Sequence, residues 1–96
     1  MRKDEIDFGG NIKKVRLKHK LTQAQFAEII GKSQSTVYGY ENNTIVPPFK
    51  VLVRISSLFN VSMNELMWGP KLEEPIHDIN RLHLIYNEIF AEKDDE

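Results

Sequence analysis

The sequence contains no cysteine, and it has no apolar run near the twenty residues that a membrane-spanning helix needs. The first absence excludes disulfide bonds and metal sites built on thiolates. The second excludes a transmembrane helix. The residues that follow Met1 are charged rather than apolar, so we also expect no signal peptide. Together these features favour a cytoplasmic protein.

Residues for metal binding or catalysis are also scarce. The chain has three histidines, His19, His77 and His83, and none has a carboxylate at the spacing of a metal site. The last two are six residues apart, which places them on different faces of a helix. The serines stand where helix caps and surface positions are expected, without a base to activate them. We therefore predict no metal, no cofactor and no enzymatic activity.

The net charge of −1 at pH 7 conceals an uneven distribution. Residues 1–69 hold ten Lys and Arg against six Asp and Glu, which gives a net charge of +4. Residues 70–96 hold three against eight, which gives −5. A chain of 96 residues suits one compact domain with an appendage. The basic part is the one suited to a polyanionic partner.

Apolar spacing and helix-capping residues divide the chain into five parts. The expected divisions are a flexible arm at residues 1–8, a compact domain at 9–69, a linker at 70–75, a C-terminal helix at 76–92 and an acidic tail at 93–96. The compact domain is expected to contain five helices, the first beginning near Gly10. Pro47-Pro48 and Ser62 mark the starts of the fourth and fifth helices.

Two short helices are predicted on either side of a glycine turn. Thr22 and Gln25 form a capping box that begins the first of them, and Gly31 ends it. Ser33 is the N-cap residue of the next helix, expected over residues 34–42. A close crossing of two helices requires a small residue and a shared apolar core. The sequence supplies these at matching spacings: Ala27 is the small residue, and Phe26, Ile30, Val37 and Tyr40 are the core.

With these features, the stretch 11–69 resembles the lambda-repressor-like domain of Cro/CI-type (XRE) helix-turn-helix regulators. Leu21-Thr22-Gln23, Ala27, Gly31, Val37 and Tyr40-Glu41-Asn42 carry the resemblance. It implies an all-α fold, a five-helix DNA-binding bundle with an additional C-terminal helix. It also implies that the third helix lies in the major groove of double-stranded DNA. Residues 1–8 and 70–96 lie outside it.

The third helix presents residues suited to reading bases. Gln34, Ser35 and Tyr38 fall on its polar face, opposite the apolar pair, and glutamine can bond the adenine edge in two places. Gly39 has two interpretations: the missing Cβ lets DNA approach closely, or glycine is merely tolerated there.

Other residues are candidates for the DNA backbone or for structure. The resemblance places Gln23 on a phosphate, where helix-terminal N–H groups also suit an anion. The remaining phosphate candidates are Lys32, Thr36, Asn42, Asn43 and Thr44. Arg16 and Glu41 resemble an interhelical ion pair of the family. Asn43 departs from the glycine usual at that position.

The C-terminal helix has an apolar stripe at spacings of 3, 4 and 3, typical of a helix seam. The stripe consists of Ile79, Leu82, Tyr86 and Ile89, broadened by Ile85 and Phe90. It either pairs two chains or folds back on its own domain, and we expect it to form a dimer interface. The predicted function is a repressor that binds a pseudo-palindromic operator as a homodimer, without an evident small-molecule effector. The alternative is a protein-interaction module, such as an antitoxin or anti-repressor partner.

Overall fold

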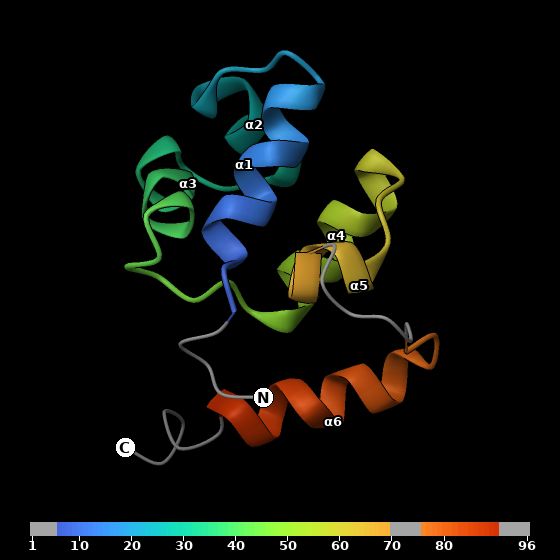
Figure 1. Ribbon diagram of the computed structural model, residues 1–96. Coiled ribbons are helices and arrows are strands. Elements are labelled where there is room, and N and C mark those ends of the chain that lie inside the picture. Colours follow the sequence, from blue (N-terminus) through green and yellow to red (C-terminus); the bar gives the residue numbers. More distant parts are fainter. Residues whose placement is uncertain (1–5, 70–75, 91–96) are drawn as a thin grey trace.

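The computed structural model describes residues 6–69 and 76–90, which contain six α-helices and no strand (Figure 1). The helices are α1 (Phe8–Lys18), α2 (Gln23–Ile30), α3 (Gln34–Glu41), α4 (Phe49–Phe59), α5 (Met63–Trp68) and α6 (Ile79–Phe90). The predicted all-α architecture, five helices followed by a C-terminal one, is confirmed. None of the helices in the described part of the chain is long and apolar enough to cross a lipid bilayer.

The ends of α2 and α3 are set by the capping residues that the sequence indicates. The Gln25 amide donates to Thr22 Oγ1 over 3.1 Å, and the Thr22 amide donates to Gln25 Oε1 over 2.9 Å, so both bonds of the capping box are present. Gly31 ends α2 in the left-handed conformation, with φ of 76°. Ser33 accepts a hydrogen bond from the Thr36 amide at the start of α3. The predicted capping box, the glycine end of α2 and the Ser33 cap are thereby confirmed.

The first helix begins earlier than predicted. Asp7 is its N-cap residue and accepts a hydrogen bond from the Gly10 amide over 2.8 Å. Phe8, the first helical residue, is only 4% exposed and belongs to the core. The expectation of a flexible arm through residue 8 is therefore wrong at its end, because an aromatic side chain there is buried. Residues 1–5 of the expected arm lie outside the described residues.

The core forms where α1, α2 and α3 meet and continues between α4 and α5. The crossing of α2 and α3 buries the predicted set, in which every side chain is at most 2% exposed: Phe26, Ala27, Ile30, Val37 and Tyr40. Ile12 and Val15 of α1 pack on the same cluster. Met67 and Trp68 at the end of α5 are buried in the same core.

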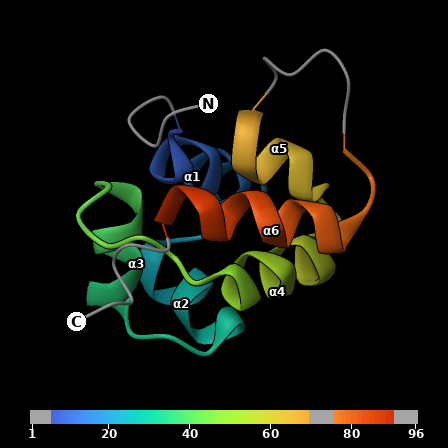
Figure 2. The ribbon, with the colours of Figure 1, turned by 90° about the horizontal axis from the view of Figure 1, so that it is seen from below.

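The last helix folds back onto its own domain. In Figure 2, α6 lies across the end of the bundle, with α1 and α5 along one side and α4 along the other. Its docking begins before the helix does, because the Asn64 side chain bonds both the N–H and the C=O of Ile76 at 2.8 and 2.6 Å. The expected linker, 70–75, and the end of the chain, 91–96, lie outside the described residues.

The apolar stripe of α6 packs within one chain, which differs from the expected dimer interface. Leu82 and Phe90 are buried, and Ile85, Tyr86 and Ile89 are partly buried against the same core. Ile79, at the start of the helix, remains 42% exposed. A stripe at this spacing suits either arrangement, and the core of the domain takes up most of it.

Candidate nucleic-acid interface

The two faces of α3 have different tasks. Val37 and Tyr40 fix one face in the core, where both are at most 2% exposed. On the opposite face, Gln34, Ser35 and Tyr38 are exposed, and Tyr38 has 59% of its surface free. The structure therefore places these three predicted base-contacting residues together on one accessible surface. We call these three residues the reading face.

Gly39 does not belong to this surface. It is buried, and a Cβ at this position would lie 2.4 Å from Ile45 Cδ1 and 2.7 Å from Ile45 Cγ1. The loop that follows α3 thus crosses directly over Gly39. The interpretation that the missing Cβ lets DNA approach is wrong, because the side where a Cβ would stand faces this loop rather than solvent. Glycine is not merely tolerated there either, because a Cβ would overlap Ile45.

The predicted pair of Arg16 and Glu41 joins α1 to the end of α3. Arg16 Nε donates to Glu41 Oε2 over 2.6 Å, and Arg16 Nη2 donates to Glu41 Oε1 over 3.1 Å. The two side chains are 11% and 4% exposed. This two-point geometry is the strongest form of a carboxylate pair with arginine. Arg16 Nη1 also donates to the Leu21 carbonyl over 2.8 Å, which ties in the segment before α2.

Gln23 shares this carboxylate, a contact that sequence reasoning missed. Its Nε2 donates to Glu41 Oε1 over 3.1 Å. The side-chain amide at the start of α2 is therefore held by the end of α3. One of the two N–H groups of Nε2 is used in this bond, so the predicted phosphate contact would have to use the other.

Most of the other predicted phosphate contacts have partners within the chain. Asn42 Nδ2 donates to the Tyr38 carbonyl over 2.8 Å, and Thr44 Oγ1 donates to the Gly39 carbonyl over 3.2 Å. Thr36 Oγ1 lies 2.9 Å from Ser33 Oγ. These side chains stabilise the turns around α3.

Asn43 connects α3 to the start of α1. Its φ of 60° is left-handed, which explains why glycine is usual here. Asn43 Oδ1 accepts a hydrogen bond from the Gly9 amide over 3.0 Å, and Nδ2 donates to Asp7 Oδ1 over 2.9 Å. An asparagine thus combines the turn conformation with a bridge that glycine cannot make.

None of the three residues of the reading face is a cation, and the lysines differ in how near they lie to it. Lys32, in the turn between α2 and α3, is partly exposed. On α1, Gly9 and Arg16 face α3, whereas Lys14 and Lys18 line a hollow of about 100 Å³ with residues 59–61 and 65. These two lysines therefore lie on the opposite side of α1 from α3.

The Tyr40 hydroxyl stays neutral on the buried side of α3. Burial raises the pKa of Tyr40 above its usual value, and the charge of Arg54 lowers it in part.

No group of three or more His, Cys, Asp and Glu side chains that could hold a metal ion occurs among the described residues.

Known proteins resemble this chain in both sequence and fold. Residues 12–66 match the profile of the helix-turn-helix family. The HTH-type transcriptional regulator YqaE of Bacillus subtilis is 34% identical over 90 residues, which cover 93% of this chain and 78% of that protein. Antitoxin PezA of Streptococcus pneumoniae is 37% identical over 70 residues, which cover 73% of this chain and 44% of the antitoxin.

A transcriptional regulator from Listeria innocua has a similar fold, with a TM-score of 0.63. The similarity covers 88% of this chain and 77% of that one, at 23% sequence identity, so it concerns the fold alone. The structure shows two helices that cross over a glycine turn, and the second helix has an exposed polar face. The family match covers both helices. The chain belongs to the XRE family of helix-turn-helix, DNA-binding transcriptional regulators.

Proposed function

We propose that this chain is a repressor that binds a pseudo-palindromic operator as a homodimer, with α3 of each chain in the major groove. The observation that carries the proposal is the reading face. Gln34, Ser35 and Tyr38 are exposed side by side on a helix whose other face is fixed in the core. Amide and hydroxyl groups recognise base edges by hydrogen bonds, and glutamine suits adenine. A rigid helix presents them without an ordering cost.

Pairing of two chains is part of this proposal, because two reading faces about one DNA turn apart recognise two half-sites. Leu82 and Phe90 are buried in the core of their own chain. We therefore expect two chains to pair through a surface other than the main part of the α6 stripe.

Selection of bound DNA from a random-sequence pool tests the proposal. We expect the selected sites to contain two related half-sites whose centres are roughly 10 base pairs apart. Affinity measured between about 50 and 200 mM salt should fall with a log–log slope of several units, because phosphate contacts release counterions. No binding at low salt, or enrichment of no sequence, would contradict the proposal.

Replacing Gln34 with alanine should relax base preference at one position in each half-site. The expected loss is about 1–3 kcal/mol for each lost base contact, measured as Kd on the selected site and on its single-base variants. Folding should be unaffected, because Gln34 is exposed. Gln23→Ala is the matched control: it should weaken all sites similarly, since Gln23 is a phosphate candidate. Equal discrimination by wild type and Gln34→Ala would show that the groove assignment is wrong.

The similarity to an antitoxin favours a second candidate, in which the chain binds and neutralises a partner protein. The chain spans 44% of that antitoxin, so this applies to the matched part only. Co-expression separates the two functions. An antitoxin restores the growth of cells that express the product of a neighbouring gene, whereas a simple repressor leaves their growth unchanged.

A further inference from the structure

The loop between α3 and α4 lies in contact with both α3 and α6. On the α3 side, the amides of Thr44 and Ile45 donate to the Gly39 carbonyl over 2.9 and 3.2 Å. The Ile45 side chain also lies over Gly39, where no Cβ would fit. The first half of the loop is therefore attached to the middle of α3.

The second half of the loop lacks such bonds. Pro47 and Pro48 have no N–H to donate. Among the described residues outside the helices, no backbone–backbone hydrogen bond involves Val46 or Pro47. Pro47 is nevertheless fully buried, so its carbonyl requires a partner.

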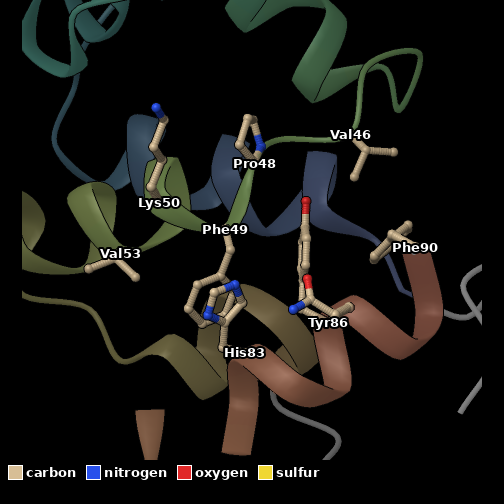
Figure 3. Close-up of a pocket in the computed structure, with 9 residues that line it drawn as sticks. Val46, Pro48, Phe49, Lys50, Val53, His83, Tyr86 and Phe90 are labelled. Carbon is tan, nitrogen blue, oxygen red and sulfur yellow. The ribbon is translucent and has the colours of Figure 1, made fainter. Parts of the chain in front are cut away.

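Tyr86 of α6 supplies that partner. Its hydroxyl donates to the Pro47 carbonyl over 2.6 Å. Figure 3 shows the Tyr86 hydroxyl directed toward the loop that carries Val46 and Pro48, with the ring beside Phe49. The ring itself is fixed, because its centroid lies 5.4 Å from that of Phe49 and 4.9 Å from that of Phe90. The adjacent turn of α6 adds a parallel stack of His83 on Phe49, at 4.4 Å.

We propose that Tyr86 is a positioning residue for DNA recognition. It holds Pro47, two residues from Ile45, and Ile45 in turn covers Gly39 of α3. The C-terminal helix thereby fixes the loop that presents the phosphate candidates Asn43 and Thr44. Without the hydroxyl, the loop has more conformations in the free protein, and DNA binding must order it. This inference rests on the proposed operator binding.

Tyr86→Phe tests the inference, since it removes one oxygen and keeps the ring in its cluster. We expect binding to the selected operator to weaken about three- to tenfold, as loss of one hydrogen bond predicts. In the free protein, hydrogen exchange should become faster at the Thr44 and Ile45 amides. Exchange at the Lys32 amide, which bonds the Ala27 carbonyl in the turn between α2 and α3, should stay unchanged. Leu84→Ala is the control on α6, because Leu84 is 65% exposed, and it should change neither quantity.

The outcomes separate this inference from the proposed function. A wild-type chain that selects no DNA sequence overturns the proposed function. If the wild type binds its site, unchanged loop exchange with unchanged affinity in Tyr86→Phe overturns the positioning role. Faster exchange at Lys32 and at the loop alike, with a lower melting temperature, also overturns it, because the hydroxyl then supports the whole fold.

Discussion

Arg16→Met is expected to destabilise the folded chain by about 3–5 kcal/mol, because it leaves the Glu41 carboxylate buried without its cation. The side chain of Glu41 is only 4% exposed, so water cannot replace the guanidinium. Gln23 remains as a neutral donor to the same carboxylate. A loss of this size should lower the melting temperature by more than about 10 °C in a domain of this length.

Thermal unfolding followed by circular dichroism measures this effect, and two further variants interpret it. Adding Glu41→Leu to Arg16→Met should recover part of the loss, because the lone buried charge is then gone. Arg54→Met is the matched control: Arg54 is exposed and donates to the Ile30 carbonyl over 2.7 Å, so its loss should cost about 1 kcal/mol. Equal effects of the two arginine substitutions would mean that the buried pair adds little.

Gly9→Ala should produce the second large effect, because α1 and α3 touch through backbone atoms at this position. A Cβ on Gly9 would lie 2.4 Å from the Glu41 carbonyl oxygen and 2.6 Å from that of Tyr40. Neither atom can rotate away, so α1 and the end of α3 must separate. Insertion of one carbon into such a contact costs about 1–3 kcal/mol. Operator affinity should fall as well, because the separation moves α3.

The neighbouring Gly10 provides the control for this prediction. The nearest atoms that a Cβ there would meet all belong to the Asp7 side chain, which can rotate at the expense of its cap hydrogen bond and its hydrogen bond from Asn43. The expected loss for Gly10→Ala is therefore about 1 kcal/mol. Denaturant unfolding measures the loss of folding free energy for both variants, provided that the dependence of that free energy on denaturant concentration (the m-value) is the same as in the wild type. A Gly9→Ala variant as stable as Gly10→Ala would refute the close contact of the two helices.

Local sequence signals were sufficient for the ends of α2, for the start of α3 and for the turn between them. Thr22, Gln25 and Gly31 act on backbone atoms within a few residues, so their spacing alone predicts their geometry. The reading face was predictable for the same reason, since helical periodicity separates Val37 from Gln34.

Contacts between distant segments were not predictable in this way. The role of Gly39 depends on Ile45 crossing it, and a lone glycine in a helix does not show which segment lies against it. The α6 stripe has the same spacing whether it meets its own domain or a second chain. Its docking depends on Asn64, which bonds Ile76 from twelve residues away and belongs to no recognisable motif.

The separation of tasks within α3 has an evolutionary consequence. The buried side chains of α3 pack in the core, whereas the side chains of Gln34 and Tyr38 are exposed and contribute little to folding. Under the proposed function, substitutions at these exposed positions would therefore alter recognition at little cost in folding. In a duplicated copy of such a gene, a few codon changes would then give a new DNA target while the scaffold stays constant.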